Sequence, residues 1–215
     1  GRPTDPELDT VLNYARGKIN VDKLVQEAVT SGKPLSKAAQ SYALRNASVD
    51  DLLKLPRTEA VYEAILKRPN ASATALRESL RGLAELRKVS SLPVLFSLIE
   101  ERDANNQTDA VAGLGQLLAE QPAAELKKSR GRLENLALKA KAAPIRQLGY
   151  VAWITTDSSG DAAFFAASKS KESLRDLLAA VPQITDAKLR GSLYNEVRSL
   201  MFELPPNLQA EAGSS

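Results

Sequence analysis

The 215-residue sequence contains neither cysteine nor histidine, and each absence excludes several kinds of chemistry. Without cysteine there is no disulfide, no zinc–thiolate or iron–sulfur site, no thiol nucleophile and no residue for covalent haem attachment. Without histidine the chain lacks the commonest general base and the usual metal ligand. Carboxylates, lysine, tyrosine and serine still support some reactions, so these absences favour a non-catalytic protein with no cofactor and no metal.

Long apolar runs are also missing. No stretch of about 18 apolar residues occurs and no basic, apolar leader opens the chain, so we expect neither a membrane span nor an intact signal peptide. Hydrophobic residues make up 43% and charged residues 26% of the sequence, which is the range of folded soluble domains. Because the sequence opens at Gly1 and its single methionine is Met201, we expect a fragment or a processed chain.

The excess of positive charge is small. The formal net charge is +3 and the pI is near 9.1, well short of the concentrated basic stripe of a dedicated nucleic-acid binder. The most basic stretch is diluted by Glu125 and Glu134, and at helical spacing it places only Lys128, Arg132 and Lys139 on a shared side. A solvated, mixed-charge surface is therefore the favoured interpretation, and a nucleic-acid partner is not expected.

Helix signals recur along the chain, whereas strand signals with a period of two residues are nearly absent. Ser48 is expected to cap one helix and Ser72 or Thr74 a longer one, and a further helix is expected after Ser170. The longer helix has Leu76, Leu80, Leu83, Ala84 and Leu86 as its expected inner face. Other helices are expected before Ala47, from Pro93 to Glu101, from Thr108 to Glu120, after Pro144, from Ala162 to Ala167 and from Asp186 to Met201.

About a dozen short helices joined by short turns favour stacked helix pairs of roughly 35 to 45 residues each. We therefore predict an all-α fold, a HEAT/armadillo-like α-solenoid of about five to six degenerate helix pairs. One domain is expected over residues 1–204, with a disordered tail over residues 205–215. Three expected second helices carry an arginine directly after their first large apolar residue, at Arg77, Arg146 and Arg190. A plain antiparallel bundle remains the alternative.

Glycines inside the expected helices also recur, at Gly82, Gly113 or Gly115, Gly149 and Gly191. Each costs about 1 kcal/mol relative to alanine in a helix interior, so a close approach of neighbouring helices is the expected compensation. The stretch 150–156 is rich in strand-forming residues. Since the apolar spacing that begins after Pro144 continues through it, we predict a helix there.

Trp153 and Tyr150 form the main aromatic cluster, and Phe164 and Phe165 follow shortly after. These rings either stack on a ligand or fill the core between helix pairs, and the second interpretation is favoured. A candidate interaction surface combines the first two rings with basic residues of the preceding stretch. Its members are Lys128, Arg132, Lys139, Arg146, Tyr150 and Trp153.

Two acidic pairs, Asp50–Asp51 and Glu100–Glu101, raise the question of acid–base or metal chemistry. Both lie at expected helix ends. We therefore expect a capping role for the first pair and plain solvation for the second.

Four segments resemble the helical-repeat region of large multi-domain bacterial haem-binding proteins of the PVC cytochrome c type. They are YALRN at 42–46, DDLLKLPRT at 50–58, RQLGYVA at 146–152 and LRDLLAAVP at 174–182. In that family the repeats lie between a propeller-like, dehydrogenase-related domain and a cytochrome c domain, and the proteins are exported. The family's haem motif needs cysteine and histidine, so the resemblance implies no haem ligand or catalytic residue in this chain.

Taken together, the sequence predicts a non-catalytic interaction or spacer module that holds neighbouring domains or a protein partner through a curved surface. The resemblance implies that the parent is an exported redox protein. The competing hypothesis is a HEAT-like nucleic-acid-binding protein or DNA glycosylase, which needs Trp153 or Tyr150, a carboxylate and several arginines to meet in one groove. The sequence leaves the partner, the binding face and the oligomeric state open, and it assigns no small-molecule ligand.

Overall fold

The computed structural model describes residues 43–45 and 47–200, and all regular secondary structure within them is helical. The predicted all-α class is confirmed for this part of the chain. The helices expected before residue 43 and the tail expected after Leu204 lie outside the described residues. The described helices are α4 (Val49–Lys54), α5 (Glu59–Leu66), α6 (Ala73–Arg87), α7 (Ser91–Ala104), α8 (Val111–Ala119), α9 (Ala123–Lys128), α10 (Arg130–Lys139), α11 (Ala143–Asp157), α12 (Asp161–Ala167), α13 (Lys171–Ala180), the short 3-10 helix η1 (Val181–Gln183), α14 (Ala187–Ser192) and α15 (Tyr194–Leu200).

The chain divides into two compact units between Ile65 and Leu66. The described part of the first unit contains α4 and nearly all of α5, with Leu52, Val61 and Ile65 buried. The second unit contains α6 to α15. This boundary lies inside the stretch that the sequence assigned to one repeat domain.

Serine caps set the starts of three helices. Ser48 accepts the N–H of Asp51 at 3.1 Å at the start of α4, and Ser170 accepts the N–H of Ser173 at 3.1 Å at the start of α13. Ser72, rather than Thr74, begins α6 by accepting the N–H of Ala75 at 3.2 Å. Each cap satisfies a backbone donor that has no partner inside its own helix. The capping predictions at Ser48 and Ser72 are therefore confirmed.

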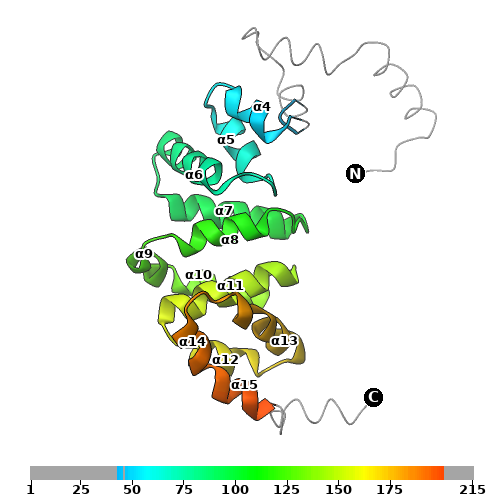
Figure 1. The fold of residues 1–215 in the computed structure, drawn as a ribbon, viewed down its shortest axis with the longest axis vertical. Helices are drawn as coiled ribbons and strands as arrows, with labels where there is room; N and C mark the ends of the chain where they lie inside the picture. Colours follow the sequence, from blue (N-terminus) through cyan, green and yellow to red (C-terminus); the bar gives the residue numbers. More distant parts are fainter. Residues whose placement is uncertain (1–42, 46, 201–215) are drawn as a thin grey trace, which may run out of the picture. The chain divides into compact units, whose positions relative to one another are not determined.

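Within the second unit, four helices contact one another in sequence order: α6 contacts α8, α8 contacts α11, and α11 contacts α13. The intervening helices pack beside them, with α7 against α6 and α8, α10 against α11, and α12 against α13 (Figure 1). The largest buried side chains include Trp153 and Tyr150 of α11 and Phe96 of α7. The strand-forming stretch 150–156 belongs to α11, as predicted.

Glycines of α8 and α11 mark close approaches between helices. A Cβ added at Gly149 would lie 2.4 Å from the backbone nitrogen of Ala137 in α10. Added at Gly113 and Gly115, it would lie 2.9 Å from a methyl group of Leu76 and 3.0 Å from one of Leu148. The predicted explanation therefore holds for these three positions. It does not hold for Gly191, where nothing lies within 4 Å.

Three local predictions are wrong. Leu86 is 52% exposed, because at 3.6 residues per turn it points about 200° away from the buried Ala84. Phe165 is 72% exposed, because α12 buries Ala163 and Ala167 and turns Phe165 outward. The helix expected from Asp186 to Met201 is interrupted at Leu193, which separates α14 from α15.

Candidate interaction surface

Half of the predicted interaction surface lies inside the fold. Tyr150, Trp153 and Arg146 are 0%, 2% and 8% exposed, so none of them is available to a partner at the surface. For the two rings, the alternative interpretation as core residues is confirmed. Sequence spacing placed them on a helix correctly, but it could not show that α10 and α13 both pack against α11.

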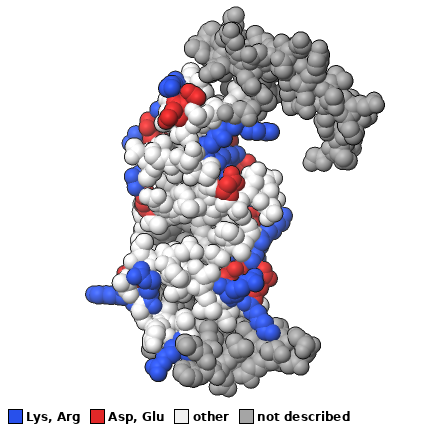
Figure 2. Space-filling model, turned by 45° about the vertical axis from the view of Figure 1, so that its right-hand side comes forward, with Lys and Arg blue, Asp and Glu red and all other residues white. Residues whose placement is uncertain are grey.

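The other three predicted residues lie on two different helices and do not form a basic patch. Lys128 of α9 pairs with Glu125 at 3.3 Å. Arg132 of α10 donates to Glu100 of α7 at 2.7 Å, and its guanidinium lies 4.3 Å from the centre of the Phe96 ring. Lys139 is exposed at the far end of α10. On the face drawn in Figure 2, cations and anions form small groups separated by uncharged surface.

Buried Arg146 is the centre of a polar network that joins α11 to α13. Its Nε donates to Asp176 at 2.6 Å and its Nη2 to Glu172 at 2.7 Å. Its Nη1 donates to the backbone oxygens of Ala140 at 2.9 Å and Lys141 at 2.7 Å. One guanidinium therefore holds the turn before α11 and the helix that packs on α11. Charge-assisted bonds of this kind are about twice as strong as neutral ones.

The same turn is held from its other side by α7. Asp103 accepts the backbone N–H of Lys141 at 3.0 Å and that of Ala142 at 2.9 Å. Asp103 thus satisfies the amides of residues 141 and 142, and Arg146 satisfies the carbonyls of residues 140 and 141. Because unpaired backbone groups are costly to bury, both side chains fix how α10 leads into α11.

The aromatic cluster is part of a second tie, between α10 and α11. The Tyr150 and Trp153 rings are stacked with centroids 6.4 Å apart. The indole N–H of Trp153 donates to Asp157 at 2.8 Å, and Arg130 both pairs with Asp157 at 2.9 Å and lies 5.2 Å from the indole centre. Burial raises the pKa of Tyr150 to about 12, with Asp176 acting in the same direction and Ser173 and Arg146 opposing it. The phenol therefore stays protonated at neutral pH.

Further ion pairs connect helices at the surface. Arg77 of α6 holds Glu120, just after α8, through two hydrogen bonds of 2.6 and 2.7 Å. Lys67 pairs with Glu101 at 2.7 Å. Since Glu100 pairs with Arg132, the expectation of plain solvation for Glu100–Glu101 is wrong. The sequence showed the acidic pair but not Lys67 and Arg132, the distant cations that pair with it.

One open, mostly apolar groove in the second unit lies among α6, α7, α9 and the residues that directly precede α7 and α9. Its volume is about 370 Å³, and its apolar floor includes Ala84, Val89 and Leu92, with Arg81 and Glu125 at its rim. Within the described ranges, no three residues of the metal-binding types come together. None of the described helices is long and apolar enough to cross a membrane.

Over the described residues these observations define an all-helical fold, in which buried Arg146 and Asp176 join α11 to α13 and buried Arg102 holds the loop before α8. Comparison with family models, with curated proteins and with solved structures finds no match to this chain.

Proposed function

We propose that the chain is a non-catalytic helical-repeat module, of the α-solenoid type, that holds a protein partner or neighbouring domains. The observation that carries this proposal is the ordered contact of α6 with α8, α8 with α11 and α11 with α13. Stacked repeats in which each unit contacts its neighbours present extended surfaces for binding.

The use of the buried charges supports a holding role. Arg146 and Asp176 are the buried groups that catalysis would be expected to exploit, and both are engaged in the link between α11 and α13. Arg102 is 3% exposed at its side chain and is engaged by the carboxylate and the backbone oxygen of Asp109. Such groups stabilise a fixed arrangement of helices.

The glycosylase hypothesis has less support. It requires Trp153 or Tyr150 in an open groove with arginines and a carboxylate, and both rings are buried. Fluorescence polarisation with labelled single- and double-stranded DNA at low salt should therefore show no binding. An affinity that falls linearly with the logarithm of salt concentration would favour this hypothesis instead.

We further propose that the parent protein is an exported redox protein of the haem-binding type that the sequence resembles. The support is the resemblance of four sequence segments to that family's repeat region. Sequencing the complete reading frame and staining the full-length product for covalent haem test this proposal. A full-length protein without a haem motif would refute it.

The holding role itself is tested by calorimetric titration of the 215-residue chain with each domain that flanks it in the full-length protein. We expect at least one domain to bind saturably at equal stoichiometry. Absence of binding by every flanking domain, together with an unchanged distance between those domains when the chain is deleted, would overturn the proposal.

A further inference from the structure

Arg146 and Arg190 make the same local contacts in successive parts of the second unit. Nη1 of Arg146 donates to the carbonyls six and five residues earlier. Nη1 of Arg190 also donates to the carbonyls six and five residues earlier, those of Ile184 and, at 3.1 Å, Thr185. The sequence repeats around them as well, because each arginine follows a large apolar residue and precedes a tyrosine by four positions.

The two arginines differ in the hydrogen bonds of their other two guanidinium nitrogens, Nε and Nη2. Nε and Nη2 of Arg146 are both taken by carboxylates of α13, those of Asp176 and Glu172. Nε and Nη2 of Arg190 have no hydrogen-bond partner among the described residues. Glu172 and Asp176 lie 26 and 30 residues after Arg146. Positions at the same two distances after Arg190 lie beyond Ser215.

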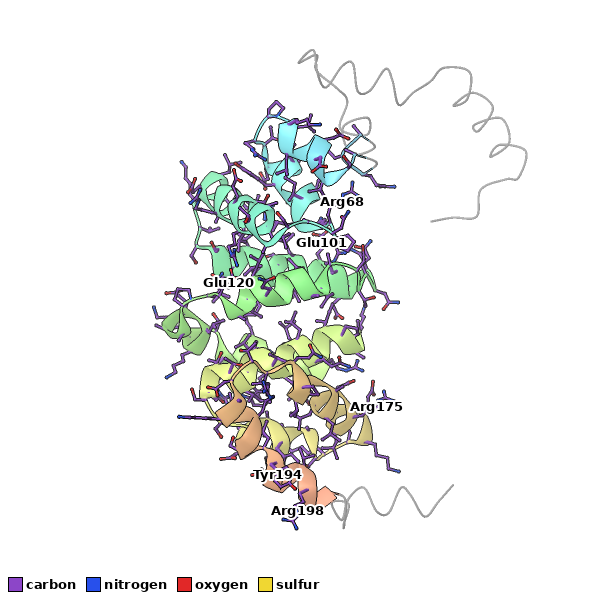
Figure 3. All side chains as sticks on the ribbon, in the orientation of Figure 1. Arg68, Glu101, Glu120, Arg175, Tyr194 and Arg198 are labelled. Atoms are coloured by element: carbon purple, nitrogen blue, oxygen red, sulfur yellow. The ribbon has the colours of Figure 1, made fainter. Side chains whose placement is uncertain are left out.

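The two tyrosines show the same difference. Tyr150 is fully buried where α13 packs on α11, close enough to Ser173 and Asp176 for both to influence its phenol. Tyr194, which follows Arg190 at the same spacing, is 61% exposed at the start of α15 (Figure 3). Among the described residues, no helix covers Tyr194 as α13 covers Tyr150.

We propose that Arg190 and Tyr194 form a docking site for a helix with two carboxylates four residues apart, supplied from outside residues 1–215. The docked helix places one carboxylate on Nε and the other on Nη2 of Arg190 and covers the Tyr194 ring with its apolar side, as α13 does at Arg146 and Tyr150. This inference rests on the proposed holding role and specifies the chemistry of the partner.

The test uses the 215-residue protein and a hydrocarbon-stapled helical peptide with the sequence of residues 170–181, which contains Glu172 and Asp176. We expect the peptide to bind in calorimetry and to shift the side-chain Nε–H resonance of Arg190 in NMR spectra. A control peptide with E172Q and D176N should bind at least tenfold more weakly, because it lacks both charges.

Two protein variants complete the design. Tyr194→Ala removes an exposed ring, so the protein should stay folded while its affinity for the acidic peptide falls at least fivefold. Arg190→Gln should weaken binding at least tenfold and abolish the difference between the two peptides. Arg198→Gln, which removes an exposed arginine of α15 outside the proposed site, is the control and should leave the affinity unchanged.

The proposal is overturned if the acidic peptide does not bind at about 1 mM, which corresponds to about 4 kcal/mol of binding free energy. Equal affinity for both peptides, or unchanged affinity of Tyr194→Ala, has the same consequence. Self-association that Tyr194→Ala abolishes would assign the site to a second copy instead. If a natural flanking domain binds the wild type and Tyr194→Ala equally, this site fails while the holding role stands. If the acidic peptide binds but no flanking domain does, the docking site stands while the holding role fails.

Discussion

Two glycines of the α10–α11 pair have opposite surroundings. A methyl group at position 149 would lie 2.4 Å from the nitrogen and 2.8 Å from the Cα of Ala137, whereas one at Gly131 would meet nothing within 4 Å. Gly149→Ala should therefore destabilise the protein by about 1–3 kcal/mol, because backbone cannot move aside as a side chain can. Gly131→Ala should stabilise it by about 0.5–1 kcal/mol through helix propensity. Urea unfolding monitored by Trp153 fluorescence measures both, and equal effects would contradict the close contact.

The buried pair Arg146–Asp176 should behave differently when one or both partners are removed. Arg146→Met leaves Asp176, whose side chain is 2% exposed, without its counter-charge, and should cost about 3–5 kcal/mol. The double variant Arg146→Met with Asp176→Leu should recover much of that loss, since no buried charge remains. Arg175→Met, an exposed change on α13, should stay within about 0.5 kcal/mol of the wild type. Unfolding free energies that are additive in the double variant would refute the coupling.

At this scale the sequence showed which residues are unusual but not what they contact. It marked Arg146 by its place after Ile145, and Tyr150 and Trp153 by their size. It favoured the core for the two rings but kept all three residues in a candidate surface, because a one-dimensional pattern does not contain the second helix that covers a side chain. Asp103, Glu172 and Asp176 carried no signal beyond being acidic, since their partners lie 26 to 39 positions away in sequence. Phe165 was misplaced because the period of a seven-residue helix offers too few positions to define a face.

At the scale of single helices, the caps provide a matched comparison. Ser170 accepts the N–H of Ser173 at the start of α13, while Ser90 occupies the same position at the start of α7 without a capping hydrogen bond from its side chain. Ser170→Ala should therefore lower the free energy of unfolding by about 1 kcal/mol, and Ser90→Ala should change it by only a few tenths. Thermal and urea unfolding of the two variants provide the measurement, and equal losses would argue against the assigned cap.

The pair Arg77–Glu120 predicts a pH-dependent link between α6 and the end of α8. The Arg77 hydrogen bonds hold the pKa of Glu120 below its ordinary value of 4.5 in the folded protein. A carboxyl with a depressed folded pKa stabilises the fold above its unfolded pKa and loses that contribution as the pH falls through the folded pKa. Glu120→Gln should therefore be less stable than the wild type near neutral pH, and the difference should disappear as the pH falls below about 4.5.

A control for this link is Glu85→Gln. Glu85 lies 3.8 Å from Arg81 on α6, and both side chains are about three-quarters exposed, so the pair holds no second helix. Its removal should leave stability almost unchanged at every pH. Urea unfolding at a series of pH values compares the two variants. A Glu120→Gln difference that persists in acid would show that charge is not its cause.

Helix existence was largely predictable from sequence, whereas helix ends and breaks were less so. Proline, serine and aspartate define starts through local hydrogen bonds, and these starts were found at Ser48, Ser72 and Ser170. The break at Leu193 was missed, because the apolar spacing continues across it. Its surroundings are tertiary: Leu193 packs so close to Gly160 that a Cβ on that glycine would lie 1.8 Å from the leucine.

At the scale of the whole molecule, the division between Ile65 and Leu66 predicts two separate unfolding events. Trp153 is the single tryptophan and lies buried in the second unit, so its fluorescence reports that unit alone, whereas far-UV circular dichroism reports helices on both sides of the boundary. The two urea transitions should therefore not coincide. Gly149→Ala should move the whole fluorescence transition but only part of the dichroism transition. Superimposable curves for both proteins would indicate one cooperative unit.

The turn at residues 140–142 has a consequence for how this protein tolerates changes of length. Asp103 holds its amides and Arg146 its carbonyls, so an added residue would pull one set of groups away from its partner. Peptide tags and inserted domains belong instead beside Ser158, an exposed residue in the loop after α11, where lengthening a surface loop costs little. Natural insertions and deletions should avoid the turn at residues 140–142 and accumulate in the loop after α11.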